Sequence, residues 1–531
     1  MLSAGIASIN FAARHPAPDA SAVAHAAHFP VRRMRIDPLS VLRRTFGYQE
    51  FRGAQREIIE RLVHAESGDG HVLLLMPTGG GKSLCYQIPA ICLDGGTIVI
   101  SPLIALMQDQ VEALRKKDIP ATFINSTVSK GEREARLEGF INGAYKMLYV
   151  TPERFRKPEF ISSLRRADIA LLAVDEAHCV SAWGHDFRPD YSRIGEFREL
   201  LGNPLTIALT ATATTEVQHD IINRLHLDPA RVRLVHEGIG RPNLRLEARE
   251  VFSDKEKLDT IIRTLEDYRG SGIVYFSLIK TLEEISGRLR DKRIPHGVYH
   301  GKLSAEERRR SQRRFMRGEN ELMLATNAFG MGIDKADIRL IIHAEVPSSI
   351  ESYYQEIGRA GRDGRDSLCM LIYNQEDLSI QMEFIKWSNP DSGFYSRLYG
   401  ILKGSTDRAN AMGAGFLREE MTFRNRRDFR VETALGMLDR YGVTEGELEN
   451  RNLRVIADLP DELLDDEALE AKRLNDNKKL LSLVQYFRGE ECRRLFINEY
   501  FGFHDELPCG NCDRCSEAAA AADDISTSDP A

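Results

Sequence analysis

Long apolar runs are missing from this sequence, since none approaches the roughly 20 residues that a helix needs to cross a bilayer. We therefore expect no membrane-spanning segment. An excess of basic charge is missing as well, because the formal net charge of the 531 residues is −7. This balance excludes a protein coated in cationic charge. It does not exclude nucleic-acid binding, because a groove can be basic while the exterior is acidic.

Cysteine is scarce, and eight cysteines in a chain of this length exclude a disulfide scaffold. Acidic residues are nearly absent from the first 33 positions, which are rich in Ala and Pro. That stretch fits a disordered extension, a transit peptide, or a start codon assigned ahead of Met34. Apolar residues make up 42% and charged residues 28%, which is ordinary for a globular protein, and the length predicts several domains.

Residues 76–83 have the sequence of a phosphate-binding loop, MPTGGGKS, between an apolar strand and a helix expected to begin near Lys82. Its glycines let backbone N–H groups close around phosphate oxygens, and the helix N-terminus adds positive potential. Met76 stands where the usual motif has its first glycine, so the strand–turn–helix context carries the prediction. The predicted nucleotide-binding residues are Thr78, Gly79, Gly80, Gly81, Lys82 and Ser83.

Two carboxylates, Asp175 and Glu176, end a second apolar run and are followed by Ala177 and His178. Asp175 can hold Mg²⁺ together with Ser83, and Glu176 can polarise the attacking water. A Gly-Lys-Ser sequence alone is often an ordinary turn. Together with this carboxylate pair it predicts a site that hydrolyses a nucleotide.

Apolar strands alternate with helical segments over residues 40–235 and again over 245–375, which is typical of parallel α/β sheets. In such sheets the functional residues gather at the carboxyl ends of the strands. The second block has no phosphate loop, but it has Arg359 and Arg362, three apart and expected on one helical face.

A guanidinium that faces the γ-phosphate from a second lobe would act as an arginine finger, worth about 10³–10⁵ in rate. A solvated basic helix end is the alternative for Arg359 and Arg362. A site divided between two lobes predicts a motor, because ATP binding and hydrolysis would then close and open the cleft.

Four of the eight cysteines cluster near the end of the chain, with the spacing C-x16-C-x2-C-x2-C. Four soft ligands suit tetrahedral Zn²⁺, and an iron–sulfur cluster is the rival because C-x2-C-x2-C also occurs in ferredoxins. Unpaired thiols at this spacing are improbable. The predicted metal ligands are Cys492, Cys509, Cys512 and Cys515.

These residues resemble the RecQ family of superfamily-two DNA helicases, over about 40–385 and again over about 475–515. The most specific feature is the sequence SAWGHDFRP at 181–189. In that family this aromatic-rich loop senses single-stranded DNA and couples it to hydrolysis. Trp183 and Phe187 offer faces for base stacking, worth about 1–3 kcal/mol per base, and Arg188 adds charge for the backbone. A buried Trp and Phe that stabilise a loop are the alternative.

The resemblance implies further roles. Tyr48 would stack on the adenine base, and Arg52 and Gln55 would read its edge. The other implied site residues are Ser101 for the DNA backbone, Thr210 and Thr212 for coupling hydrolysis to lobe movement, Asp334 for the nucleotide, Gln355 as an organising residue, and Arg359 and Arg362 as γ-phosphate sensors.

The flanks of the cysteines closely resemble the RecQ zinc-binding module, which implies structural Zn²⁺ rather than an iron–sulfur cluster. We therefore predict an α/β protein with two RecA-like parallel-sheet lobes, followed by a mostly helical zinc-binding module with an insert. The predicted divisions are a disordered extension at 1–35, a first lobe at 36–237, a second lobe at 238–385, the insert at 386–475, the zinc-binding module at 476–516 and a disordered tail at 517–531.

The insert departs from the family pattern. Residues 431–443 are typical of a helix that ends at a glycine, residues 453–456 of a following strand, and five arginines between 418 and 430 precede the helix. A winged-helix DNA-binding module and a plain helical insertion both fit. Few residues follow Cys515, so we expect no counterpart of the C-terminal winged-helix and helical domains of many RecQ proteins. We hypothesise that the insert replaces their strand-separating wedge.

The resemblance implies a cytoplasmic ATP-dependent helicase that moves 3′→5′ on single-stranded DNA and unwinds duplex, with ATP, Mg²⁺ and Zn²⁺ as cofactors and roles in repair and recombination. In a bacterium it would associate with the nucleoid. Three rivals stay open: a translocase that remodels or anneals DNA, an RNA helicase, and a DNA-binding protein that hydrolyses nothing. The sequence predicts no membrane partner and names no protein partner.

Overall fold

The computed structural model describes residues 36–518 except 66–68, 78, 182, 185–186, 239, 331–332, 334, 423–427 and 505–506. The predicted site residues Thr78 and Asp334, and nearly all of the two predicted disordered ends, therefore lie outside the described residues. Among the described helices, none is both long and apolar enough to cross a membrane.

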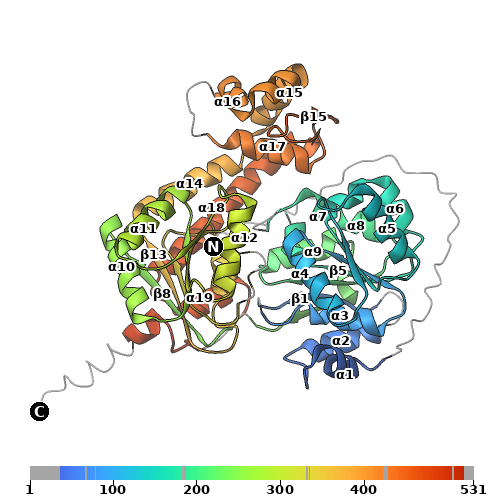
Figure 1. Ribbon diagram of the computed structural model, residues 1–531, viewed down its shortest axis with the longest axis horizontal. Coiled ribbons are helices and arrows are strands. Elements are labelled where there is room, and N and C mark those ends of the chain that lie inside the picture. The colour runs from blue at the N-terminus through green and yellow to red at the C-terminus, as the bar shows by residue number, and fades with distance from the viewer. Residues whose placement is uncertain are drawn as a thin grey trace, which may run out of the picture.

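A seven-stranded parallel sheet forms the first lobe, with the strand order β3-β4-β2-β5-β6-β1-β7 (Figure 1). Its inner strands are buried on both faces, which is why they form continuous apolar runs in the sequence. The strands are β1 (His71–Leu75), β2 (Gly96–Ile100), β3 (Ala121–Ile124), β4 (Met147–Val150), β5 (Ile169–Val174), β6 (Leu205–Thr210) and β7 (Val232–His236). The α-helices are α1 (Pro38–Val41), α2 (Gln55–Val63), α3 (Leu84–Cys92), α4 (Ile104–Arg115), α5 (Lys130–Ile141), α6 (Pro158–Leu164), α7 (Pro189–Ser192), α8 (Ile194–Leu200) and α9 (Thr215–Arg224).

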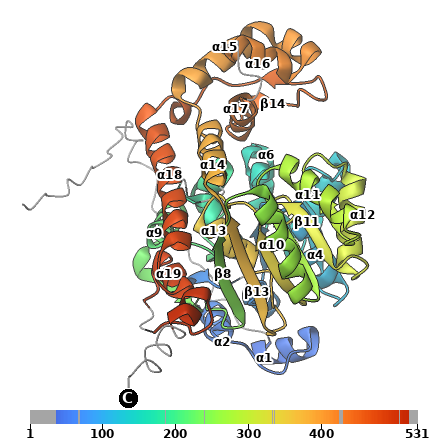
Figure 2. The same ribbon diagram turned by 90° about the vertical axis from the view of Figure 1, so that its left-hand side faces the viewer.

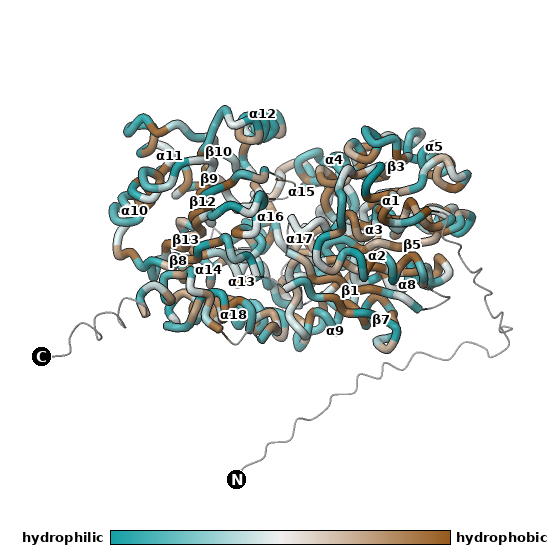
Figure 3. Tube along the Cα trace, turned by 90° about the horizontal axis from the view of Figure 1, so that it is seen from below, coloured by the Kyte–Doolittle hydropathy of each residue, from teal (hydrophilic) through white to brown (hydrophobic). Residues whose placement is uncertain are grey.

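A six-stranded parallel sheet forms the second lobe, in the order β10-β11-β9-β12-β13-β8. Figure 3 shows apolar residues concentrated on the strands of both lobes and polar residues on outer helices such as α10 and α12. The strands are β8 (Leu244–Glu250), β9 (Ser271–Phe276), β10 (Gly297–Tyr299), β11 (Leu322–Thr326), β12 (Ile338–His343) and β13 (Ser367–Tyr373). The helices are α10 (Asp254–Asp267), α11 (Ile279–Asp291), α12 (Ala305–Met316) and α13 (Ile350–Ile357).

Two long helices, α14 (Gln375–Ser388) and α18 (Asp466–Arg488), lead from the second lobe to a separate small domain and back (Figure 2). That domain contains α15 (Ser392–Met412), α16 (Ala414–Thr422), α17 (Arg430–Arg440) and an antiparallel hairpin of β14 (Thr444–Glu445) and β15 (Arg454–Val455). It has an apolar core of its own. Three helices followed by a two-stranded hairpin is the order of elements in a winged helix.

After α18 the chain forms α19 (Arg493–Tyr500) and then the segment that carries Cys509, Cys512 and Cys515. This helical hairpin shares one apolar cluster with the second sheet, because Tyr486, Phe487 and Phe501 pack together with strand residues of β8, β9 and β13. The cysteine-bearing segment is therefore part of the second lobe's core.

Strands at the sheet edges gave no clear signal in the sequence. In β7 a single residue, Val235, is buried, and β8 alternates Leu244 and Leu246 with charged residues. An edge strand needs few apolar side chains because one flank and part of each face meet solvent. The sequence pattern therefore does not predict β7 or β8 as strands.

Candidate ATP site and DNA-coupling elements

The phosphate-binding loop joins β1 to α3 and takes a conformation that requires glycine. Gly79 and Gly81 have φ angles of +86° and +87°, in the left-handed region that side-chain-bearing residues avoid. The Lys82 ammonium donates a hydrogen bond to the Met76 carbonyl at 3.1 Å. Burial lowers the pKa of Lys82, and the charges of Glu176 and Asp175 oppose that shift. Lys82 is thus held at the loop, and the negative charges of the two carboxylates favour its protonated form.

Met76 explains how the loop works without its usual first glycine. Its backbone N–H donates to Thr210 O at 3.1 Å, so residue 76 continues the pairing of β1 with β6. Its side chain is buried and fills the space beneath Gly80, where an added Cβ would lie 2.6 Å from Met76 Cγ. The methionine and Gly80 therefore fit each other.

The two carboxylates stand at the end of β5, beside the loop. The Asp175 N–H bonds to Ile100 O at 2.9 Å, and Glu176 follows with a φ of +48°. Burial, and then the charge of Glu176, raises the pKa of Asp175 to about 7, while Lys82 acts in the opposite direction. A buried carboxylate in this state fits a divalent cation, which would supply the missing positive charge. Asp175 and Ser83 are the residues that would hold Mg²⁺.

A short polar chain connects Glu176 to the end of β6. Oε2 of Glu176 lies 3.5 Å from His178 Nδ1, and Nδ1 lies 2.9 Å from Oγ1 of Thr210. The Thr210 hydroxyl donates to Thr212 O at 3.1 Å. Both threonines are buried, and their role in coupling hydrolysis to lobe movement stays a prediction.

Ser101 was predicted as a DNA-backbone contact. Ser101 is 2% exposed and lies beside Asp175, where burial raises the pKa of the carboxyl and Ser101 acts to lower it. In this conformation Ser101 therefore belongs to the interior of the ATP site.

The predicted adenine-recognition residues lie next to the loop. Gln55 is buried; its Nε2 donates to Gly80 O and Gly81 O at 3.2 and 3.4 Å, and its Oε1 accepts the Arg52 N–H at 3.0 Å. Tyr48 is 49% exposed, with the Arg52 guanidinium 5.9 Å from its ring centre. A pocket of about 200 Å³ opens beside them. Its lining includes Phe46, Tyr48, Gly81, Ser83, Gln87 and Lys117.

The two arginines of the second lobe do not share a helical face, so that expectation was wrong. Helix α13 ends at Ile357, and both arginines follow it in turns. Arg362 lies against the phosphate loop, because a Cβ added to Gly79 would be 3.2 Å from its Cγ and Cδ. Arg359 is 5% exposed and donates to Gly330 O within its own lobe. The structure brings only Arg362 to the loop, and Gln355 is half-buried on α13.

The aromatic-rich loop is anchored to its own lobe at both ends. The Trp183 N–H donates to Ser181 Oγ at 3.2 Å, and the Arg188 N–H donates to Cys179 O at 3.1 Å. Trp183 is 42% exposed, which argues against a buried tryptophan, whereas Phe187 and Arg188 are half-buried. An exposed indole in this position is available for a base.

The four clustered cysteines meet the geometry of a tetrahedral metal site. All four sulfurs lie within 4.8 Å of one another, and the pairs Cys509–Cys515 and Cys492–Cys512 are 3.9 and 4.0 Å apart. Zinc–sulfur bonds of about 2.3 Å in a tetrahedron require sulfur–sulfur distances of about 3.8 Å. Although burial acts upward, backbone N–H groups such as that of Cys509 lower the pKa of Cys492 to about 7, which favours the thiolate that a metal needs.

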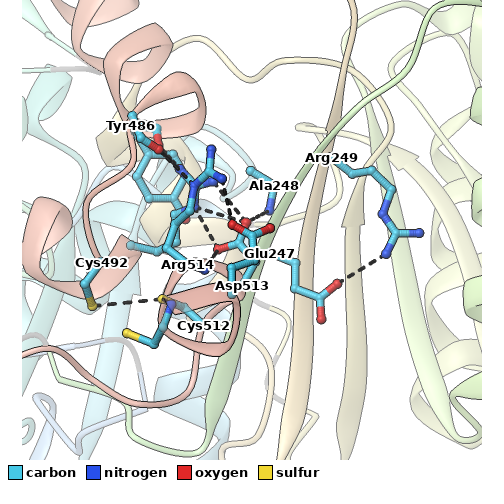
Figure 4. A network of polar contacts seen from close by, with 12 residues as sticks. Glu247, Ala248, Arg249, Tyr486, Cys492, Cys512, Asp513 and Arg514 are labelled. Atoms are coloured by element: carbon cyan, nitrogen blue, oxygen red, sulfur yellow. Dashed lines mark hydrogen bonds and ion pairs between the residues drawn. The ribbon is translucent and has the colours of Figure 1, made fainter. Parts of the chain in front are cut away.

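A buried ion pair docks this metal site on β8 (Figure 4). The guanidinium of Arg493 is 1% exposed and bonds Asp513 at 2.9 Å through Nε and 2.9 Å through Nη2. The same carboxylate accepts the Ala248 N–H of β8 at 3.0 Å. The metal site thereby extends the edge of the second sheet.

Comparisons with known proteins agree with these features. Family models match at residues 52–221 (DEAD/DEAH box helicase), 255–364 (helicase conserved C-terminal domain) and 455–516 (RecQ zinc-binding). The ATP-dependent DNA helicase RecQ of Bacillus subtilis is 38% identical over 91% of this chain and 68% of its own length. The probable ATP-dependent DNA helicase RecS of the same organism is 39% identical over 68% of this chain and 72% of its own.

This chain belongs to the RecQ family of ATP-dependent DNA helicases. The family confirms Zn²⁺ rather than an iron–sulfur cluster for the four cysteines, and the sites fit ATP, Mg²⁺ and Zn²⁺. A solved structure, the Mycobacterium smegmatis helicase Lhr bound to ssDNA and AMP-PNP, has a TM-score of 0.52 at 18% identity. The match covers 84% of this chain and 63% of the Lhr chain, and it supports the two-lobed fold.

Sequence reasoning missed the polar contacts between segments of this RecQ chain that lie far apart. Lys479 of α18 donates to Gly184 O of the aromatic-rich loop, and Arg156 donates to the carbonyls of Asp439 and Arg440 at the end of α17. Main-chain acceptors carry no residue-type signal, so the sequence offered only a lysine directly before an apolar stretch that begins at Leu480.

Proposed function

We propose that this RecQ-family helicase hydrolyses ATP to move 3′→5′ along single-stranded DNA and to separate duplex strands during repair and recombination. It would act in the cytoplasm, on the nucleoid in a bacterium. The observation that carries the proposal is the shared ATP site, in which Arg362 of the second lobe lies against Gly79 of the first. Hydrolysis changes the charge at that contact, so it changes what holds the lobes together. A motor that steps along a strand requires this coupling.

Each residue of the site has a task that its position supports. The loop N–H groups and Lys82 bind the phosphates, and the predicted Mg²⁺ ligands Ser83 and Asp175 place a cation that neutralises phosphoryl charge when bound. Glu176 orients and polarises the attacking water. Glu176 contacts His178, and His178 contacts Thr210 at the end of β6, so a change at the water would be felt by β6. Arg362 would stabilise the charge that develops on the γ-phosphoryl group.

DNA-stimulated ATP hydrolysis tests this proposal. We expect turnover to rise when single-stranded DNA is added, to rise much less with RNA of equal length, and to vanish in Lys82→Ala. Equal stimulation by RNA would support an RNA helicase, and turnover that ignores every nucleic acid would contradict the proposal. Because backbone contacts should dominate, the DNA concentration needed for half-stimulation should rise with salt.

A translocase that remodels DNA without efficient unwinding is the second candidate, and the insert favours it. The hairpin carries three acids, Glu445, Glu447 and Glu449, against two arginines, Arg451 and Arg454, and Arg454 is paired with Glu445 at 3.1 Å. An acidic hairpin is repelled by duplex phosphates, so it makes a poor wedge. If deletion of residues 391–464 with a short Gly/Ser linker leaves unwinding unchanged, the hypothesis that the insert acts as a wedge is refuted.

A further inference from the structure

Helix α18 of the zinc-binding module holds the main chain of the aromatic-rich loop. Nδ2 of Asn475 donates to Trp183 O at 3.5 Å, and the ammonium of Lys479 donates to Gly184 O at 2.9 Å. The two donors are four residues apart, so they lie on one face of α18, one turn from each other. They bind the carbonyl of the residue whose ring is exposed and the carbonyl that follows it.

Lys479 is a buried charged residue, and acidic residues lie near it. Lys479 is 8% exposed, and burying an ammonium group is costly unless its charge is compensated. Burial lowers the pKa of Lys479, and Glu351 is the largest opposing influence. Glu351 is 3% exposed; Tyr500 donates to its Oε1 at 2.9 Å, and its Oε2 has no hydrogen-bond partner among the described residues. The buried Glu351 carboxylate, together with Asp476, therefore supplies negative charge near Lys479.

Glu351 also connects this site to the ATP site. It lies in the first turn of α13, the helix that leads into the turn carrying Arg362. A hydrogen bond joins α18 to α13, because Tyr486 OH donates to Tyr353 OH at 3.2 Å. Figure 2 shows α18 running along the second lobe past α13. One helix therefore contacts the loop beside Trp183 and the helix before Arg362.

We infer that Lys479 and Asn475 are positioning residues that hold Trp183 for single-stranded DNA and link its position, through the packing of α18 on α13, to Arg362 at the phosphate loop. The inference rests on the proposed DNA-stimulated ATPase and assigns to the zinc-binding module a part in coupling. Neither residue touches ATP or the reacting atoms. Their bonds to successive carbonyls fix the main chain from which the indole projects.

Lys479→Met tests the inference, with Lys478→Met as the matched control. Lys478 is the neighbouring residue on α18 and is exposed, so the control removes the same charge without a buried partner. We expect Lys479→Met to raise the DNA concentration for half-maximal ATPase stimulation about tenfold or more, the loss of one charge-assisted buried hydrogen bond. At saturating DNA, turnover should fall much less. Lys478→Met should match wild type.

A milder pair guards against a folding defect. Asn475 is only half-buried, so Asn475→Ala should fold and should raise the half-stimulating DNA concentration by a smaller factor, with Asn477→Ala as its exposed control. Lys479→Arg keeps a charged donor, so its half-stimulating DNA concentration should lie between those of wild type and Lys479→Met. A purely structural loss would not allow this partial recovery. The zinc content of every variant should equal that of wild type.

The outcomes separate this inference from the proposed function. If wild type shows no DNA stimulation, the proposed function itself fails. If wild type is stimulated but Lys479→Met behaves like Lys478→Met, or loses basal and stimulated turnover by the same factor, the inference is overturned. Combining each variant with Trp183→Ala supplies a direct check: the effects of Lys479→Met and Trp183→Ala on half-stimulation should be non-additive.

Discussion

Replacing Arg362 should remove most of the ATP turnover without loosening the fold. Its side-chain carbons lie 3.2 Å from the Cβ position of Gly79, and its charge acts to lower the pKa of Lys82, after burial and against two acids. The guanidinium is therefore close to where the γ-phosphate must sit. An arginine finger contributes about 10³–10⁵ in rate, so Arg362→Ala should lower kcat about 10³-fold, or about 4 kcal/mol of barrier.

Arg359→Ala provides the contrast. Arg359 is buried and bonds Gly330 O, so its loss should lower both turnover and the free energy of unfolding, whereas Arg362→Ala should change unfolding by less than about 1 kcal/mol. Single-turnover hydrolysis at saturating DNA measures the first quantity, and urea unfolding measures the second. If Arg362→Ala keeps more than a tenth of wild-type turnover, the contact with Gly79 is not a finger and the reasoning is wrong.

Further predictions concern stability. Lys257 pairs with Asp377 at 3.0 Å in the second lobe, where burial raises the pKa of Asp377 to about 6 and Lys257 opposes the rise. Lys257→Met should cost about 3–5 kcal/mol at pH 8. The cost should shrink towards pH 5, because Asp377, its pKa raised further without Lys257, then takes up a proton in the folded state; urea unfolding at the two pH values would show a constant cost if this is wrong. Arg493→Met should strand the Asp513 carboxylate, destabilise the second lobe by a similar 3–5 kcal/mol or so, and speed zinc release to a chelator, against Arg488→Met as an exposed control. Removing zinc from wild type by chelation should lower the unfolding temperature. An unchanged temperature would mean that the metal does not stabilise the fold.

The ATP and zinc sites could be predicted from the sequence because each depends on residue types at fixed spacings. Glycines at 79 and 81 are needed for positive φ, a carboxylate pair must end a buried strand, and four cysteines must converge, so residue type and spacing state the geometry almost directly. The inner strands were equally clear because strands buried on both faces are continuously apolar.

The long-range arrangement was not readable in the same way. The spacing of Arg359 and Arg362 suggested a helix, but α13 ends before both, and only the packing of Gly330 and Gly79 decides which arginine turns inward and which reaches the loop. Lys479 and Asn475 act on main-chain carbonyls, which every residue has. Contacts of that kind are set by tertiary packing and leave no pattern in the sequence.

Strand separation on tailed duplexes tests the central claim most directly. The substrates carry a 3′ or a 5′ single-stranded tail, ATP is present, and Glu176→Gln serves as the inactive control. The account predicts unwinding of the 3′-tailed duplex alone, abolished in the control. ATP hydrolysis stimulated by DNA without any strand separation, or unwinding from the 5′ tail, would contradict it.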